Sequence, residues 1–302
     1  MRVRFWGTRG SIAKAGPTTV RYGGNTSCVE VRAEDGTLAV LDCGTGAHGL
    51  GQALVAEAPS VDGHLLIGHT HWDHIQGMPF FAPLFVAGNS WHIYAPRGLG
   101  QHLEDTLAGQ MQYTYFPVSL QDLGATIHYH ELVEESFKVG GIDVTAQYLN
   151  HPALTLGYRL SADGATLVYS TDHEPFARNI AETDLRAPVG AALTPDDRRH
   201  CDFLCDSDLV IHDSQYLASE YPDKVGWGHS TIEYAIALAI EARARHLVLF
   251  HHDPLRDDGA VDAVLSSARR QARKLGSAMV ITAAMEGDEI ELPAVAGREI
   301  ER

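Results

Sequence analysis

Short runs of apolar residues, several of them alternating with polar ones, recur along the whole chain. Runs of this length between glycine-containing turns are typical of strands that are buried on one or both faces. They predict strands at residues 3–6, 28–31, 38–41, 65–67, 91–94, 142–148, 154–160, 167–169, 209–211 and 247–250. The first third of the chain is therefore expected to be rich in strands.

An apolar period of 3.6 residues predicts helices among these strands. One covers residues 49–57, and a last one covers about 259–275 and ends at Gly276. Between them, a helix is expected to begin after Ser230, because a serine followed three residues later by Glu233 is the pattern of a capping box. Strands that alternate with helices predict an α+β fold in which helices cover sheets.

The composition is that of an ordinary globular protein, with 302 residues of which 45% are hydrophobic and 21% charged. Because no linker or repeat divides the chain, we expect a single domain over residues 1–302, with insertions near 99–120 and 184–206. No run of about 18 apolar residues and no secretory signal is visible, so no membrane segment is expected. The four cysteines are too few for a disulfide framework and predict reduced thiols and a cytoplasmic location.

The charge of the chain bears on its partners. The formal net charge is −16 at pH 7, and no run of lysine or arginine occurs. Proteins that bind a long polyanion usually carry a basic face, so this charge disfavours a large nucleic acid as substrate. Arg9 and Arg21 lie on glycine-containing turns and are candidates for phosphate contacts, although arginines are common on exposed turns.

The densest chemistry lies in His69-Thr-His71-Trp-Asp73-His74, which directly follows an apolar run. Imidazole and carboxylate groups are the ligands that Zn²⁺ and similar cations take. On an extended chain His69 and His71 point to the same side and could hold one ion. Asp73 and His74 could hold a second ion where the chain turns into a helix. Buried polar groups without such a partner would be costly, so the segment predicts a metal site.

Further histidines and aspartates stand at the ends of other predicted strands. They are His151, Asp172, Asp213 and the pair His251 and His252. Apolar strands that each deliver such a residue at the carboxyl end would place a ring of ligands on a rigid scaffold. We therefore expect these residues to complete the site that one segment alone cannot form.

Together these segments resemble the metallo-β-lactamase superfamily, and within it the phosphodiesterase branch that includes ribonuclease Z and the phosphoribosyl cyclic phosphodiesterases. The resemblance covers about residues 1–275 and is carried by the His/Asp segment and by the motifs FWGTRGS (5–11), LDCGTG (41–46), NHP, YSTDHEP, GWGHST and LVLFHH. It implies a four-layer αββα sandwich with a metal site at the strand ends between two sheets.

The resemblance also implies two divalent metal ions and assigns their ligands. One ion is assigned to His69, His71 and His151, and the other to Asp73, His74 and His251, with Asp172 bridging both. Asp42 matches a structural aspartate, and His251 is preferred to His252 because it directly follows the strand LVLF. Zn²⁺ is the first choice for this ligand set, with Mn²⁺ or Fe as alternatives.

A phosphodiesterase activity follows from the same resemblance. Two ions that share a water would lower its pKa and hold it in line with phosphorus, while the departing alkoxide needs a proton. His229 in GWGHST matches the general acid of this branch, and Asp213 is either its partner or a turn carboxylate. The predicted catalytic residues are therefore His229, Asp73 and Asp213.

The sequence leaves the substrate class open. A small phosphodiester such as a cyclic nucleotide is the leading hypothesis, and a thioester or lactone is the alternative for the same site. A ligand sensor without turnover is a third, non-enzymatic hypothesis. The aromatic-rich segment 110–118 is expected either to cap the pocket or to form a homodimer contact.

Overall fold

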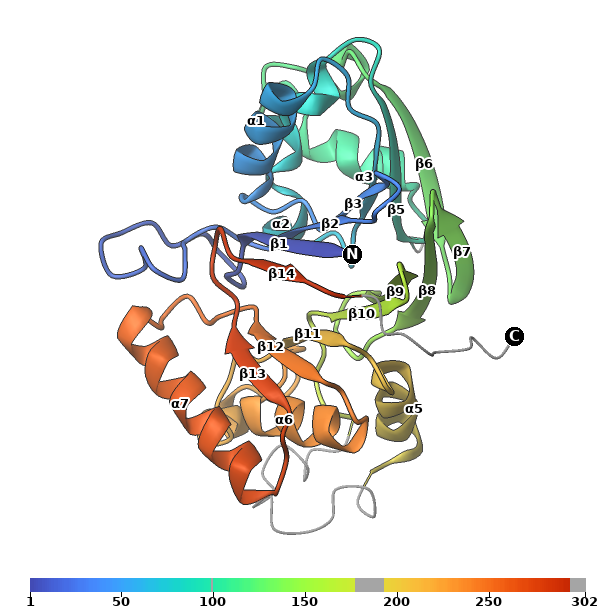
Figure 1. Cartoon of the computed structure of the whole chain (residues 1–302). Coiled ribbons are helices and arrows are strands. Elements are labelled where there is room, and N and C mark those ends of the chain that lie inside the picture. The colour runs from blue at the N-terminus through green and yellow to red at the C-terminus, as the bar shows by residue number, and fades with distance from the viewer. Residues whose placement is uncertain (99, 177–192, 294–302) are drawn as a thin grey trace.

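The computed structural model describes residues 1–98, 100–176 and 193–293. Two seven-stranded sheets pack face to face, and helices cover the outer face of each sheet (Figure 1). These four layers confirm the predicted αββα sandwich.

The first sheet has the strand order β14-β1-β2-β3-β4-β5-β6. Its strands are β1 (Arg2–Gly7), β2 (Cys28–Arg32), β3 (Leu38–Leu41), β4 (Gly63–Leu66), β5 (Ser90–Pro96), β6 (Thr126–Leu132) and β14 (Glu289–Glu291). The second sheet has the order β13-β12-β11-β10-β9-β8-β7. Its strands are β7 (Glu135–Val139), β8 (Ile142–Tyr148), β9 (Leu156–Ala162), β10 (Ala165–Ser170), β11 (Leu209–Asp213), β12 (His246–Phe250) and β13 (Val280–Ala283).

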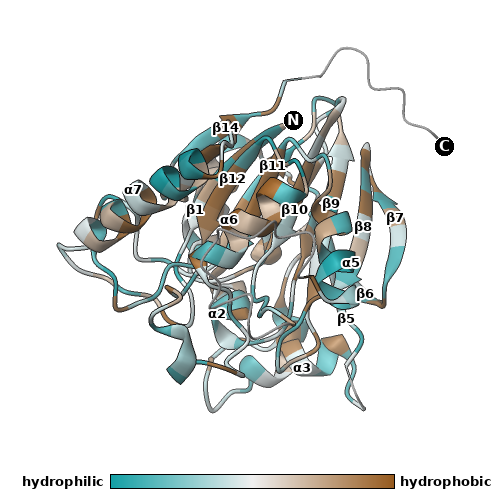
Figure 2. Cartoon of the chain, turned by 90° about the horizontal axis from the view of Figure 1, so that it is seen from below, coloured by the Kyte–Doolittle hydropathy of each residue, from teal (hydrophilic) through white to brown (hydrophobic). Residues whose placement is uncertain are grey.

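The helices lie on the two outer faces, with α1 and α3 against the first sheet and α5, α6 and α7 against the second (Figure 1). The α-helices are α1 (Ala47–Glu57), α2 (Trp72–Ile75), α3 (Leu103–Gln110), α5 (Pro195–Leu204), α6 (Ile232–Glu241) and α7 (Asp258–Lys274). Short 3₁₀ turns are η1 (Met78–Phe80), η2 (Ala82–Phe85), η3 (Leu120–Asp122) and η5 (Tyr221–Asp223). In Figure 2 the central strands are mainly hydrophobic, whereas α5 and α7 carry hydrophilic residues at the outside.

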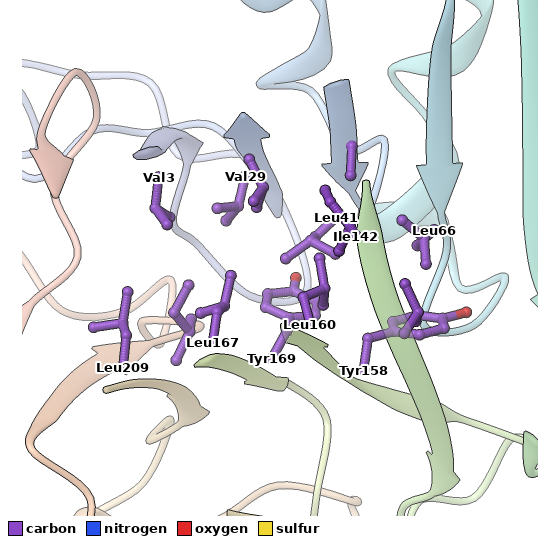
Figure 3. Close-up of a cluster of buried hydrophobic side chains, with 14 of the residues drawn as sticks. Val3, Val29, Leu41, Leu66, Ile142, Tyr158, Leu160, Leu167, Tyr169 and Leu209 are labelled. Atoms are coloured by element: carbon purple, nitrogen blue, oxygen red, sulfur yellow. The ribbon is translucent and has the colours of Figure 1, made fainter. Parts of the chain in front are cut away.

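The main core fills the space between the sheets. Val3, Val29 and Leu41 of the first sheet face Leu160 and Leu167 of the second, and all of them are buried (Figure 3). Strand β10 is buried at every residue because it lies between this core and the helices outside. That is why its central residues 167–169 are all apolar rather than alternating with polar ones.

Parallel pairing decides where the strand ends meet. Strands β3 to β6 are parallel to one another, and so are β10 to β13. The carboxyl ends of neighbouring parallel strands collect at one edge of each sheet. Residues that directly follow β3, β4, β10, β11 and β12 can therefore meet.

The strands that the hydrophobic pattern did not predict are β6, β7, β13 and β14, which are the edges of the two sheets. Two of these edge strands carry polar residues on both faces: β6, with the sequence TIHYHEL, and β7, in which three of five residues are exposed. Their apolar signal is therefore weak. The predicted strand at 154–160 begins later, at Leu156, because Leu154 is exposed.

The predicted capping box of α6 is wrong. The N-cap is Thr231, whose side chain accepts a hydrogen bond from the backbone N–H of Tyr234. Ser230 instead donates its hydroxyl to the carbonyl of His173, and the carboxylate of Glu233 accepts from a backbone N–H in another loop. Tertiary contacts thus draw Ser230 away from the helix that its sequence pattern suggested.

The expected insertions correspond to different parts of the structure. The segment 99–120 contains α3, and residue 99 lies outside the described residues. In the segment 184–206, residues 184–192 also lie outside them, and α5 occupies most of the remainder. The interpretation of 1–302 as one domain with insertions remains a prediction. Among the described residues, no helix combines the length and the apolar character that crossing a membrane requires.

Candidate metal centre

The predicted ligands meet at the carboxyl ends of the strands. After three of these strands the chain turns at a residue that has a positive φ although it is not glycine. These residues are Asp42 after β3 (60°), Asp172 after β10 (56°) and His251 after β12 (60°). A side chain makes this left-handed conformation unfavourable, and such residues cluster at functional sites. Each of these turns directs a polar side chain to the same place.

A first group consists of His69, His71 and His151, with one ring nitrogen of each within 4.8 Å of the others. The Nε2 atom of His151 lies 3.2 Å from the Nδ1 atom of His71. Neither nitrogen of the buried His69 ring has a hydrogen-bond partner among the described residues. Burial lowers the pKa of His69 well below its ordinary value, so its ring is neutral and has a lone pair. A cation between the three rings would satisfy these nitrogens.

A second group consists of Asp73, His74, Asp172 and His251, all of which are buried. The Oδ2 atom of Asp73 lies 3.3 Å from Nε2 of His74 and 3.2 Å from Nε2 of His251. Within the part of the chain that the structure describes, the Nε2 atom of His74 has no hydrogen-bond partner. This second set of imidazole and carboxylate donors also fits a divalent ion.

Asp172 lies between the two groups. Its Oδ1 atom is 3.2 Å from Nε2 of both His74 and His251, while its Oδ2 atom is 3.7 Å from Nε2 of His69 and 3.9 Å from Nε2 of His151. Burial would raise the pKa of this carboxyl, but the surrounding histidines hold it well below its ordinary value. An ionised carboxylate with one oxygen facing each group fits two cations better than one.

Hydrogen bonds from outside orient the ligand rings. The Nδ1 atom of His74 donates to Oδ2 of Asp42 (2.7 Å), and Oδ1 of Asp42 accepts the backbone N–H of Gly68 (2.7 Å). The Nδ1 atom of His251 donates to Oε1 of Gln215 (2.9 Å). A proton held on Nδ1 leaves the lone pair on Nε2, the atom that faces the other ligands.

Sequence analysis missed two of these contacts. Gln215 carried no signal, because nothing in its local sequence connects it with a ligand 36 residues away. The carbonyl of Gly228 accepts from Nδ1 of His151 at 2.9 Å. Gly228 has φ +86°, and a Cβ atom there would lie 2.1 Å from Nδ1 of His151. The glycine in GWGHST was the available signal for this close approach.

His229 and Asp213 lie beside the second group. The Nδ1 atom of His229 donates to Oδ2 of Asp213 at 2.7 Å, and the His229 ring stacks on His251 with centroids 4.9 Å apart. Burial disfavours the charged ring, but the carboxylates of Asp213 and Asp172 outweigh it and raise the pKa of His229 to about 9. Cations bound at the site would lower the pKa of His229, because a nearby positive charge disfavours the protonated ring. A proton donated from this ring to a substrate would leave from Nε2.

A ligand role for His229 is the competing arrangement. Asp172, Asp213, His229 and His251 also offer donor atoms within 4.8 Å of one another. In this arrangement His229 would hold an ion instead of donating a proton. The two roles differ in what remains after mutation of His229, because loss of an acid leaves the metal content unchanged.

The other candidates lie away from the ligands. Arg9 is fully buried and donates to the carbonyls of Gly23 and Arg256, so it connects loops and does not face a substrate. Arg21 is exposed and pairs with Asp262. His252 donates to the carbonyl of Ala284 at 2.9 Å.

Two cavities flank the ligand segment and share Thr70, which lies between two predicted ligands in the sequence. One of about 480 Å³ is lined by Thr70, Pro96, Gly98, Tyr148, Leu149, His151, Pro152, Ala153, Leu154 and Thr155. The other, of about 540 Å³, is lined by Thr70, Trp72, Ile75, Gln76, Pro79, Phe80, Thr106, Gly109, Gln110, Tyr115 and Phe116. We call the second one the aromatic cavity. The segment 110–118 contributes to its wall, while the expected homodimer contact remains a prediction.

Removal of metal is expected to abolish hydrolysis without unfolding the chain. The core between the sheets is built from apolar side chains and contains none of the ligands. Dialysis against a strong chelator should lower activity by at least about 100-fold, because the ions would carry the charge stabilisation, while circular dichroism still reports a folded protein. Added Zn²⁺ should restore the activity. Complete unfolding of the metal-free chain would mean instead that the ions are structural.

Comparisons with known proteins agree with this architecture. Residues 38–252 match the sequence model of the beta-lactamase superfamily domain. Ribonuclease BN of Cronobacter sakazakii is 26% identical over 296 residues, which cover 83% of this chain and 88% of that protein. Ribonuclease Z of Staphylococcus haemolyticus is 24% identical over 287 residues, with the same 83% and 88% coverage.

A solved structure has the same fold. The metallo-β-lactamase fold protein YhfI from Bacillus subtilis superposes with a TM-score of 0.66 at 18% identity, over 96% of this chain and 99% of that one. The family match covers most of the chain, and the ribonuclease relatives align over most of their own length. The chain therefore belongs to the beta-lactamase superfamily, in the phosphodiesterase branch of the metallo-β-lactamase fold.

Proposed function

We propose that this protein is a dinuclear metal-dependent phosphodiesterase that hydrolyses a small phosphodiester with an aromatic group, such as a nucleotide. The observation that carries this proposal is the position of Asp172, with one oxygen facing each of two ligand groups. Membership of the phosphodiesterase branch supports hydrolysis of phosphoric diesters as the reaction.

The ligand groups and His229 divide the work of such a reaction. Bound divalent ions would neutralise the phosphate oxygens and lower the pKa of a water, and Zn²⁺ is the ion we propose. Asp73 and Asp172 supply the negative charge that holds these cations in a buried site. His229, held by Asp213 through Nδ1, donates the proton from Nε2 to the departing alkoxide.

The aromatic cavity supports a substrate with a flat ring. It is lined by Trp72, Phe80, Tyr115 and Phe116, and Trp72 stands between the ligands His71 and Asp73 in the sequence. None of the described residues that line it is a lysine or arginine, which suits a neutral base or aryl group rather than a second phosphate. Stacking on aromatic side chains is the common way in which proteins bind such rings.

A ribonuclease is the second candidate function. It is supported by the names of the curated relatives, which are ribonucleases BN and Z. The net charge of −16 favours the small substrate, because an acidic chain repels a long polyanion. The thioester or lactone alternative is less well supported, because a thiolate leaving group does not require the proton that His229 can donate.

Replacement of Tyr115 by alanine tests the substrate class. With a p-nitrophenyl nucleoside phosphate, kcat/KM should fall roughly 5- to 100-fold, since one stacking contact contributes about 1–3 kcal/mol. With methyl p-nitrophenyl phosphate, which has the same leaving group but no ring on the other side, the loss should stay below about twofold. Steady-state kinetics on both esters measures the difference.

Tyr113 offers a matched control for this variant. Tyr113 and Tyr115 are 89% and 75% exposed, but only Tyr115 lines the cavity, so Tyr113→Ala should leave both esters unaffected. Equal losses on the two esters would reject the aromatic subsite. Cleavage of a precursor tRNA with a higher kcat/KM than any small diester would favour the ribonuclease. Hydrolysis of thioesters or lactones without hydrolysis of diesters would favour the thioester or lactone hydrolase.

A further inference from the structure

Four histidines share one face of the first sheet, away from the metal centre. His64 lies on β4, His92 on β5, and His128 and His130 on β6. We call them the histidine quartet. His64 is directly opposite His92 in the strand register, and His92 is directly opposite His128. The rings of these in-register pairs stack with centroids 5.2 and 4.6 Å apart.

Two nitrogens of the quartet already face each other. The Nδ1 atom of His92 lies 3.0 Å from the Nε2 atom of His130. In the metal centre the corresponding separation, between Nδ1 of His71 and Nε2 of His151, is 3.2 Å. Two nitrogens at about 2.0–2.1 Å from one tetrahedral zinc would be about 3.3 Å apart, so both separations suit a shared ion.

The remaining rings supply the third donor. His128 and His130 stand two residues apart on one strand, so their side chains point to the same side of the sheet. His128 is exposed and the other three are partly buried, which leaves the quartet open to solvent at His128. A third donor would come from His128 or His64, whose rings stack on His92, after a rotation about the side-chain bonds of either residue.

The rings are available as ligands at neutral pH. Burial and the neighbouring rings lower the pKa of His64 to about 4 and lower the pKa values of His92 and His130 below their ordinary value. A neutral imidazole keeps one nitrogen lone pair for a cation. A simple hydrogen bond between two neutral rings would also explain the contact of His92 with His130. Such a bond would not explain why His64 and His128 stand beside the same pair.

We propose that the histidine quartet is a second metal site, which binds one divalent transition ion of the kind that prefers imidazole, such as Cu²⁺, Ni²⁺ or Zn²⁺. Imidazole ligands favour these ions over Mg²⁺, Ca²⁺ and Mn²⁺, which prefer oxygen. The quartet is distinct from the metal centre, since five residues of extended chain, or about 16 Å, separate His64 from the ligand His69. An ion there would tie β4, β5 and β6 together at the side of the sheet where β6 is the edge.

Metal titration of the untagged protein tests this site. The wild type is first loaded with only two equivalents of Zn²⁺ per chain, the number expected at the metal centre, and is then titrated with Cu²⁺ and with Ni²⁺ by calorimetry. We expect one further equivalent per chain, and nitrogen hyperfine structure in the electron paramagnetic resonance spectrum of bound Cu²⁺. In the double variant His92→Ala/His130→Ala the association constant for this equivalent should fall at least 100-fold.

His102→Ala is the matched control, because this histidine is exposed and faces Glu131 outside the quartet. It should bind the further ion like the wild type. The diesterase activity of the double variant should also stay within about twofold of the wild type, which shows that the metal centre is intact.

The absence of a further equivalent in the wild type would overturn the proposal, and so would unchanged binding in the double variant. If the double variant fails to fold, the single variants His92→Ala and His130→Ala provide the same comparison, because each removes one nitrogen of the central pair. Wild-type affinity for Cu²⁺ and Ni²⁺ in both single variants, or a wild-type spectrum lacking nitrogen hyperfine structure, would leave only adventitious binding and would reject the site.

Discussion

Replacement of Asp172 by alanine is expected to remove metal from both ligand groups and to lower kcat/KM by roughly 10³-fold or more. One oxygen of this carboxylate faces His74 and His251, and the other faces His69 and His151. Without it, the buried rings lose the negative charge between them. Metal ions stabilise the transition state of such reactions by several kcal/mol, and each 1.36 kcal/mol corresponds to a factor of ten in rate.

The variant Asp172→Asn separates the charge of this residue from its backbone conformation. Asp172 has φ 56°, which asparagine adopts more readily than alanine does. Asparagine also keeps the shape of the side chain. We expect it to fold like the wild type in circular dichroism and still to lose metal and activity.

Elemental analysis measures the result directly. The metal centre should contain close to two divalent ions per chain, counted in the double variant His92→Ala/His130→Ala so that the proposed second site does not contribute. The surface variant Asp262→Ala should retain them, because the partners of this carboxylate within the described part of the chain are Arg21 and Tyr22. One ion or none in metal-replete wild type, or two ions in Asp172→Asn, would contradict the dinuclear centre.

The second large effect concerns His229. Replacement by alanine should keep the metal content and substrate affinity while kcat falls roughly 10²–10⁴-fold for diesters with an alkyl or ribosyl leaving group, which is the usual contribution of a positioned acid. With a p-nitrophenolate leaving group, which needs little protonation, the loss should be much smaller. Parallel kinetics on the two kinds of ester measures this dependence.

The pH profile provides a second readout of the same role. An acid acts while it is protonated, so kcat of the wild type on alkyl diesters should fall as the pH rises through the pKa of His229. Asp213 raises this pKa, so in Asp213→Asn the decrease of kcat should begin at lower pH. The dependence of the rate on the leaving group should weaken only partly in this variant.

Controls distinguish this role from the alternatives. The variant His48→Ala, at an exposed position of α1, should match the wild type. An equal loss of kcat on both kinds of ester in His229→Ala would reject the acid role and leave a residue that positions the substrate. Loss of one ion from the same variant would identify His229 as a ligand.

Much of the fold was predictable from the local pattern. The predicted strands 38–41 and 142–148 coincide with β3 and β8, because buried strands inside a sheet are apolar along at least one face. The edge strands β6, β7, β13 and β14 were not predicted. Strands β6 and β7 carry polar residues on both faces, which weakens their apolar pattern, and β14 has only three residues. The cap of α6 was also misplaced, because Ser230 bonds to His173 in another segment.

The candidate site was predictable as a set of residues. Each predicted ligand follows an apolar run closely, and the order of the sequence alone places such residues at strand ends. The resemblance to a known family then grouped His69, His71 and His151 separately from Asp73, His74 and His251.

The sequence by itself thus determined which strands form the interior and which residues stand at their ends, because both depend on spacing along the chain. Only the tertiary structure decided that Asp172 directs one oxygen to each ligand group, that Gln215 orients His251, and that the rings of His92 and His130 meet across two strands. Asp73 and His251, at 3.2 Å, are 178 residues apart in the chain. Distances between such segments are set by strand register and by the packing of the two sheets, which no local pattern encodes.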